Sequence, residues 1–298
     1  MRSVLLVAWF DLRESLRSRK ALALMFIYLM GAMAATGIFV TVLAEVEAVM
    51  ADTLMVARTA RPGAMTQALR ESDRMQGNLG GLLGEPGLAA ELVRIPPLGL
   101  FYGWLAMSFG PLLVTFTSAE AIAGDLASGT VRFSLFRISR LEWAAGKLLG
   151  QSALLAVGMM LGAAGVWAIG WYSLMSFEPL LNAAWLVRFA GRGWIYGFAF
   201  LGMTLGVSQL TRSINGARAL ALAGLLGLSI GGVVLMTPQA VAFAPILADT
   251  VRQLCPNAHR LNLWRPLFTE RAPALVMLLA LGGTYFSLGY QWMSRRDA

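Results

Sequence analysis

The sequence predicts an all-α polytopic membrane protein with six transmembrane helices. Of its 298 residues 57% are hydrophobic and only 13% are charged, about half the charged share of an ordinary soluble domain. Several uncharged, mostly apolar runs are also long enough to cross a hydrocarbon core of about 30 Å as helices. We attribute the net charge of +8 to Lys and Arg that flank the spans, and therefore expect no nucleic-acid partner.

Residues 1–20 predict an amphipathic helix that lies in the membrane interface ahead of the first span. At helical spacing Leu5, Trp9, Leu12 and Leu16 share one face, and charged residues occupy the other. The uncharged stretch that follows is too long for the core of a cleavable signal peptide. The alternative to an interfacial helix is that residues 1–20 are simply a charged segment that precedes the first span.

Six uncharged segments follow this helix and are expected to span the membrane. They are residues 21–44, 98–119, 148–171, 189–210, 219–243 and 272–293. The start of the fourth is the least defined, because Arg192 lies near its edge. Two long connections, residues 45–97 and 244–271, are expected to form short helices over the outer mouth of the bundle. We expect the whole chain to form one transmembrane domain.

The distribution of Lys and Arg predicts the orientation of these spans. Most of the net positive charge falls in the N-terminal segment, in residues 120–147, in the connection between the fourth and fifth spans, and at the C-terminus. Since positively charged loops stay on the cytoplasmic side, both termini are expected in the cytoplasm.

Glycines recur at four-residue spacing in several predicted spans. The pairs are Gly99 and Gly103, Gly158 and Gly162, Gly193 and Gly197, Gly202 and Gly206, and Gly227 and Gly231. Small residues on one helix face allow two backbones to approach closely in lipid. The pairs indicate either ordinary packing within the chain or, less often, a seam between two copies.

Several kinds of chemistry have no residues to support them. The centres of the predicted spans carry no Asp, Glu, Lys, Arg or His. A charge there costs at least about 2.5–3.5 kcal/mol and is kept for a mechanistic reason, so coupling to a proton gradient is disfavoured. Cys255 and His259 are the single cysteine and histidine, which excludes an intramolecular disulfide and a Cys/His metal cage. Gly146-Lys147 lacks the upstream glycine of a phosphate-binding loop. We therefore expect no cofactor in this chain and no catalytic site.

The segment GDLASGTVRFSLFRISR, residues 124–140, interrupts the apolar pattern with four charges. We expect a short helix that breaks at Gly129, and then a second helix with Val131, Leu135 and Ile138 on one face. A short amphipathic helix with aromatic side chains and arginines suits docking on a protein. A helix that rests on the inner leaflet would have the same properties.

The surrounding region, SAEAIAGDLASGTVRFSLFRISRLEWAAGKLLG at residues 118–150, resembles the signature region of ABC-2 type transporter permeases. In that family an acidic residue precedes a Gly-Thr pair, and a leucine-rich segment, a small residue with Arg, and a Gly-Lys pair follow. The matching residues here are Asp125, Gly129, Thr130, Leu135, Ser139, Arg140, Gly146 and Lys147. The sequence departs from the family at Asp125, where Glu is usual, and at Ile138, where Pro is common. The topology extends the resemblance over nearly the whole chain.

The resemblance implies the permease subunit of an ATP-binding-cassette exporter in a bacterial inner membrane. Two permease chains, identical or related, would associate with two cytoplasmic ATPase subunits that bind ATP and Mg, and residues 120–147 would supply the coupling helix. The residues expected to carry the coupling are Glu120, Asp125, Gly129, Thr130, Phe133, Phe136, Arg137 and Arg140. We expect the two carboxylates to cap the N-terminal end of the coupling helix or to position it electrostatically. The last two arginines are expected to pair with the ATPase or with lipid phosphate.

The sequence does not indicate the cargo. Aromatic residues of the spans are candidates for a substrate path, although roles in packing and at the membrane interface account for them better. These residues are Phe101, Tyr102, Trp104, Trp194, Tyr196 and Phe198. Two other functions stay open: transmission of ATP-driven motion to an extracytoplasmic protein through residues 45–97, without translocation, and a membrane-bound enzyme or scaffold that has no ATPase.

Overall fold

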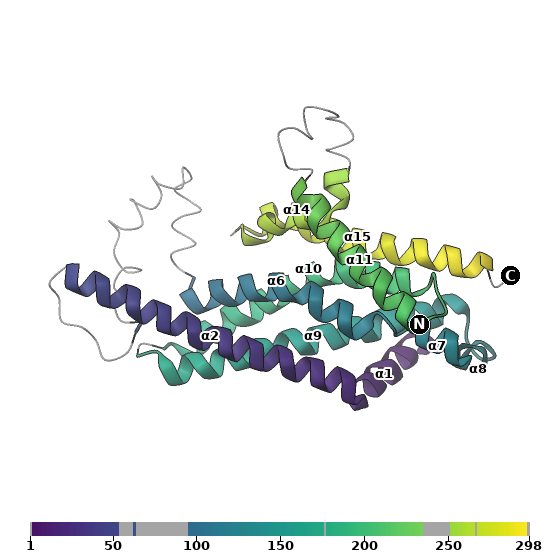
Figure 1. Cartoon of the computed structure of the whole chain (residues 1–298), viewed down its shortest axis with the longest axis horizontal. Coiled ribbons are helices and arrows are strands. Elements are labelled where there is room, and N and C mark those ends of the chain that lie inside the picture. The colour runs from purple at the N-terminus through teal and green to yellow at the C-terminus, as the bar shows by residue number, and fades with distance from the viewer. Residues whose placement is uncertain are drawn as a thin grey trace. The chain divides into compact units, whose positions relative to one another are not determined.

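The computed structural model describes residues 2–53, 62–63, 95–175, 177–234, 251–265 and 267–296. Every element in these residues is a helix, which confirms the all-α prediction for the described part of the chain. In chain order (Figure 1) they are α1 (Arg2–Arg17), α2 (Arg19–Thr53), α6 (Pro97–Ser118), α7 (Ala123–Ser128), α8 (Thr130–Leu135), α9 (Arg140–Ser173), α10 (Pro179–Ser208), α11 (Ile214–Val234), α14 (Pro256–Arg260), the 3-10 helix η1 (Leu261–Trp264) and α15 (Phe268–Arg296).

Within the described part of the chain, four helical stretches are long and apolar enough to cross a membrane. They are Arg19–Asp52, Pro97–Ser128, Arg140–Ser173 and Phe268–Arg295, and they contain the first, second, third and sixth predicted spans. The apolar part of α11, Ile214–Ile230, is shorter, and the fifth predicted span continues into residues outside the described part.

Helix α10 covers most of the fourth predicted span but is not among the four membrane-crossing stretches. It begins at Pro179, ahead of the predicted start, so that Arg188 and Arg192 lie inside the helix and lower its mean hydropathy. The helix thus begins ahead of the predicted span, and the start of the fourth span stays a prediction. The Arg192 side chain is buried, at a position within α10.

The chain divides into two compact units. The first unit comprises residues Met1–Met25, Met107–Val157 and Arg192–Ala298, and the second comprises Phe26–Ala106 and Gly158–Gly191. In the second unit, Tyr102 is fully buried and its hydroxyl donates to the backbone carbonyl of Met159. Gly162 lies against the ring of Tyr28, where a Cβ would collide with it. A glycine at this position therefore lets an aromatic ring pack against the helix backbone.

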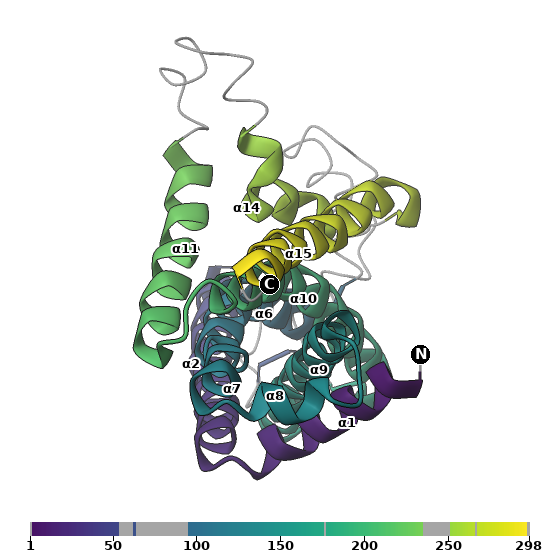
Figure 2. The same cartoon turned by 90° about the vertical axis from the view of Figure 1, so that its right-hand side faces the viewer.

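In the first unit, α15 lies beside α10 (Figure 2). The two helices approach each other at glycines. A Cβ added to Gly202 would overlap the backbone carbonyl of Gly282, and one added to Gly289 would overlap the backbone of Gly206. The pair Gly202 and Gly206 is thus explained by packing within the chain. Gly227 on α11 differs: among the described residues, and apart from the backbone of its own helix, no atom lies within 4 Å of an added Cβ.

Helix α1 packs on the beginning of α9, also through glycines. A Cβ at Gly146 would collide with Val7, and one at Gly150 would collide with Asp11. The opposite face of α1 exposes Leu5 and Trp9. The predicted N-terminal helix therefore forms, while its location in the membrane interface stays a prediction.

Candidate functional site

The polar segment that interrupts the apolar pattern forms two short helices joined at Gly129. Helix α7 ends at Ser128, α8 begins at Thr130, and Gly129 has φ +75°, a left-handed conformation that glycine adopts without strain. The hydroxyls of Ser128 and Thr130 each lie 3.3 Å from the backbone carbonyl of Asp125, to which they donate. The predicted break at Gly129 is confirmed.

We expect Gly129→Ala to destabilise this turn by roughly 1–2 kcal/mol, because an L-residue in the left-handed region brings Cβ close to the backbone. The matched control is Gly124→Ala inside α7, where an added Cβ meets nothing within 4 Å. Thermal unfolding of the purified protein in detergent should separate the two. Equal midpoints for the two variants would contradict the expectation.

Lys147 joins the segment to α1 and α9 through a buried ion cluster. Its Nζ lies 2.7 Å from Asp11 Oδ1 and 2.7 Å from Asp125 Oδ2. The side chains of Lys147 and Asp11 are only 9% and 4% exposed. Gln151, one turn further along α9, donates to Asp11 Oδ2 at 2.7 Å and accepts from Ser118 Oγ at 2.9 Å. Four helices, α1, α6, α7 and α9, therefore meet at one polar cluster.

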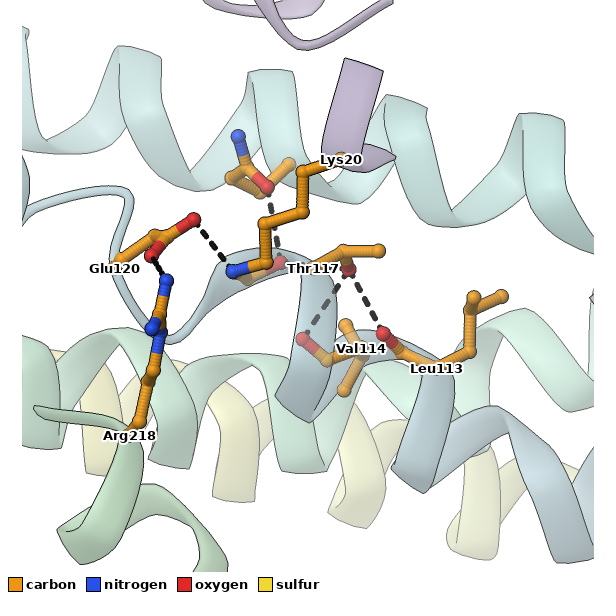
Figure 3. Close-up of polar contacts among 8 residues, drawn as sticks. Lys20, Leu113, Val114, Thr117, Glu120 and Arg218 are labelled. Atoms are coloured by element: carbon orange, nitrogen blue, oxygen red, sulfur yellow. Dashed lines mark hydrogen bonds and ion pairs between the residues drawn. The ribbon is translucent and has the colours of Figure 1, made fainter. Parts of the chain in front are cut away.

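A second cluster centres on Glu120, in the turn between α6 and α7 (Figure 3). Lys20 Nζ lies 2.5 Å from Glu120 Oε1, and the Arg218 guanidinium donates to Glu120 Oε2. Lys20 belongs to the start of α2 and Arg218 to α11. One carboxylate thus ties the turn ahead of α7 to two further helices.

The carboxylates Glu120 and Asp125 act mainly through these ion pairs. Asp125 does lie in the first turn of α7, where negative charge is favoured. The N-cap residue Ile122, however, makes no side-chain cap hydrogen bond. The first backbone N–H of α7, that of Ala123, instead donates to Ser208 Oγ at 3.0 Å. We expected Glu120 and Asp125 either to cap the N-terminal end of the helix or to position it electrostatically. The contacts of α7 show neither carboxylate as a cap.

Helix α8 and the residues after it present aromatic and basic side chains to the surface. Phe133 and Phe136 are 76% and 85% exposed, and Arg137 is exposed as well. Val131, on the other face of α8, is buried. The aromatic pair is therefore available to a partner, while the apolar face of α8 is anchored in the first unit.

The start of α9 is fixed by a capping box at Ser139 and Glu142. The Ser139 backbone N–H donates to Glu142 Oε2 at 3.1 Å, and the Glu142 N–H donates to Ser139 Oγ at 3.2 Å. This reciprocal pair satisfies two backbone donors at a helix start. Ser3 Oγ of α1 also donates to the Glu142 carboxylate. The small residue that precedes Arg140 in the sequence motif is therefore a helix cap.

Four polar residues of the two clusters escaped the sequence analysis: Asp11, Lys20, Gln151 and Arg218. Asp11, Lys20 and Arg218 stand near the ends of apolar stretches, where single charges serve as ordinary flanking residues. Gln151 is an uncharged polar residue near the start of the third predicted span. The sequence pointed to the buried cluster only through Lys147, which belongs to the same motif as Asp125. The spacing of residues did not reveal that Lys147 pairs with Asp11.

The candidate substrate-path residues fall into different parts of the structure. Phe101, Tyr102 and Trp104 belong to the second unit, and the other three to the first. Tyr196 is buried and its hydroxyl donates to Asn257, as that of Tyr102 does to a backbone carbonyl. Also in the first unit, Trp194 Nε1 donates to the Ser152 backbone carbonyl at 3.0 Å, and Phe198 packs against the Trp194 ring. In the second unit, the Phe101 ring packs against Trp104. Packing contacts thus account for several of these side chains, and a substrate path stays a prediction.

The helices and the motif define a helical membrane protein with a polar segment built between two candidate spans. A family model described as ABC-2 family transporter protein matches residues 5–288. Since the match covers nearly the whole sequence, this chain belongs to the ABC-2 transporter family, as its signature region predicted. The family implies association with ABC ATPase partners. A search of curated proteins finds no match.

Proposed function

We propose that this chain is the membrane-spanning, non-catalytic subunit of an ABC exporter in a bacterial inner membrane. It has six spans and two cytoplasmic termini, and it works as a pair of permease chains with two cytoplasmic ATPase subunits. Those subunits hold ATP and Mg, and their closure drives a substrate across the membrane. Membership of the ABC-2 family supports the transporter assignment. The observation that carries the coupling role is the exposure of Phe133 and Phe136 on a segment whose two carboxylates are tied to other helices.

The two ion clusters suit this segment to transmit displacement. Through Asp125 and Lys147 it is joined to α1 and α9, and through Glu120 it is joined to α2 and α11. Removing one partner of a buried ion pair costs about 3–5 kcal/mol, so the buried Lys147 cluster resists separation. A displacement of α8 by an ATPase is therefore passed to the starts of long helices, as rigid elements pass on domain motions.

We expect the double variant Phe133→Ala, Phe136→Ala to weaken ATPase binding by about tenfold or more, because buried aromatic anchors carry much of the binding energy of an interface. The measurement is co-purification in mild detergent with a coexpressed ABC ATPase encoded by a neighbouring gene. The matched control is Phe268→Ala at the start of α15, a phenylalanine that is 68% exposed.

Two results would count against the proposal. Equal ATPase recovery from the double variant and from the Phe268→Ala control would remove α8 as the docking element. Failure of the wild-type chain to retain any nucleotide-binding protein under coexpression would remove the ABC coupling itself. The double variant is expected to keep the thermal stability of the wild type, since both rings are exposed.

A further inference from the structure

The connection between the fifth and sixth predicted spans contacts the first unit through polar side chains. Within its described residues 251–265, α14 packs against α11 and α15 (Figure 2). The hydroxyl of Tyr196 on α10 donates to the Asn257 side chain of α14. Asn257 Nδ2 in turn donates to the backbone carbonyl of Ser229 on α11 at 3.2 Å. A single amide side chain therefore ties α14 to two other helices.

Two more hydrogen bonds tie the same connection to α6 and α15. The Arg260 guanidinium, at the end of α14, donates to Ser108 Oγ of α6 at 2.7 Å. The Tyr285 hydroxyl of α15 donates to the backbone carbonyl of Leu254, just ahead of α14. Residues 251–265 are thus joined to four helices of the first unit.

The four helices place these contacts at one common depth. Ser108 lies about three turns before the end of α6, Tyr196 about three turns before the end of α10, and Tyr285 about three turns before the end of α15. Ser229 lies about four turns after the start of α11. Each of these helix ends is predicted on the cytoplasmic side. Three to four turns measure about 16–22 Å along a helix, and the hydrocarbon core is about 30 Å thick. The contacts therefore fall in the middle part of the membrane.

The backbone of the connection is built for this depth. Irregular backbone inside a membrane is tolerated where the protein buries it and where its polar groups are paired. Cys255, at the break ahead of α14, is 4% exposed, and Leu263 in η1 is fully buried. The Cys255 N–H donates to the Arg252 carbonyl at 3.0 Å, and the Arg265 N–H donates to the Asn262 carbonyl at 3.3 Å.

We infer that residues 251–265 form a re-entrant segment, which enters the membrane from the outer side and turns back near its centre. The hydrogen bonds of Tyr196 and Ser108 hold the segment at this depth. The sequence predicts short helices over the outer mouth for this connection, so the inference changes their depth. A charge inside a membrane is kept for a reason, and the role of Arg260 is to anchor the segment to α6. The inference rests on the spanning topology of the proposed function and requires no ATPase.

The first test measures the depth of the re-entrant segment in lipid vesicles. A bimane fluorophore is attached at Leu261→Cys in a Cys255→Ala background, since the Leu261 side chain is 77% exposed. Its depth is measured by quenching with lipids that carry a nitroxide on the headgroup or deep in the acyl chain. The matched control is a label at Tyr172→Cys in the same background, at a 79% exposed position in the last turn of α9. We expect the Leu261 label to lie roughly 10–15 Å deeper than the Tyr172 label, up to half the thickness of the core.

The two labels separate failure of the inference from failure of the topology. A shallow Leu261 label beside a shallow Tyr172 label would place the segment over the outer mouth and overturn the inference alone. A deep Tyr172 label would overturn the predicted spans, and the inference with them. Loss of the ATPase partner in a separate co-purification experiment would leave both depths unchanged.

The second test uses Cys255, the single cysteine of the chain, as a reporter of the hydrogen bonds. The double variant Tyr196→Phe, Ser108→Ala removes two side-chain hydrogen bonds to the segment. Because the thiol is buried in the described structure, we expect it to react with a maleimide about tenfold faster in this variant than in the wild type. The matched control is Tyr102→Phe, which removes the hydrogen bond of a buried tyrosine in the second unit and should keep the wild-type rate.

Equal labelling rates in the wild type and the double variant would show that these hydrogen bonds do not hold the segment. Equal acceleration in Tyr102→Phe would assign the reactivity to general loosening of the fold and would also overturn their role. Ser108→Ala alone should give a smaller acceleration with an unchanged midpoint of thermal unfolding, which guards against misfolding of the double variant.

Discussion

Replacement of Lys147 by methionine is expected to destabilise the protein by about 3–5 kcal/mol. The substitution keeps an apolar stem of similar length but removes the ammonium group that lies 2.7 Å from both Asp11 and Asp125. The Asp11 side chain is almost fully buried, so its carboxylate would lose its ionic partner without gaining water in exchange. Thermal unfolding in detergent, followed by tryptophan fluorescence, should show a lower midpoint temperature.

Two further variants make this result specific to the buried cluster. Lys20→Met removes a partly exposed partner of Glu120, which keeps Arg218, and is expected to cost less than about 1 kcal/mol. The triple variant Asp11→Asn, Asp125→Asn, Lys147→Met removes all three charges and should recover much of the lost stability, since neutral replacement of a buried ion cluster is often tolerated. Similar midpoints for Lys147→Met and Lys20→Met would contradict the importance of the buried cluster.

Replacement of Gly202 by alanine is expected to cost about 3 kcal/mol, the upper end of the usual penalty for added volume in a packed core. The new methyl group would overlap the backbone carbonyl of Gly282. Because this neighbour is backbone and not a flexible side chain, α10 and α15 would have to move apart. Lower yield of monodisperse protein and a lower midpoint of thermal unfolding are the measurements.

The matched control for this substitution is Gly227→Ala on α11. An added Cβ there has no atom within 4 Å, and alanine is the better helix former by about 0.5–1 kcal/mol. The control should therefore be neutral or slightly stabilising. If both variants were equally destabilised, the close approach of α10 to α15 would not explain the glycine at position 202.

The described helices follow from local sequence signals to a large extent. Long apolar runs predicted the four candidate membrane-crossing stretches of the described residues, and Gly129 predicted the break between α7 and α8. The start of the fourth span was the least defined boundary, because Arg192 lies near its edge, and α10 begins ahead of that boundary. Arg188 and Arg192 lie inside a helix that continues past them. Hydropathy alone does not show whether a charged residue marks the end of a helix or lies inside it.

The candidate site was predictable only in part, since its polar contacts join residues far apart in the sequence. Asp125 and Gly129 could be identified because motif and turn chemistry are local. The ion pair between Lys147 and Asp11 could not be predicted, because it forms only when α1 packs on α9. The four-residue spacing of Gly146 and Gly150 indicates that some helix approaches α9 closely, but the spacing does not indicate which helix.

The distance in sequence between the partners of the buried cluster has a consequence for biosynthesis. Asp11 and Gln151, which hydrogen-bond to each other, are separated by 140 residues. At roughly 5–20 residues per second, the ribosome needs about 7–28 s to make that interval. During this time two candidate spans are completed before Lys147 and Gln151, the partners of Asp11, are synthesised. Docking of the N-terminal helix is therefore a late, post-insertion event in the maturation of this chain.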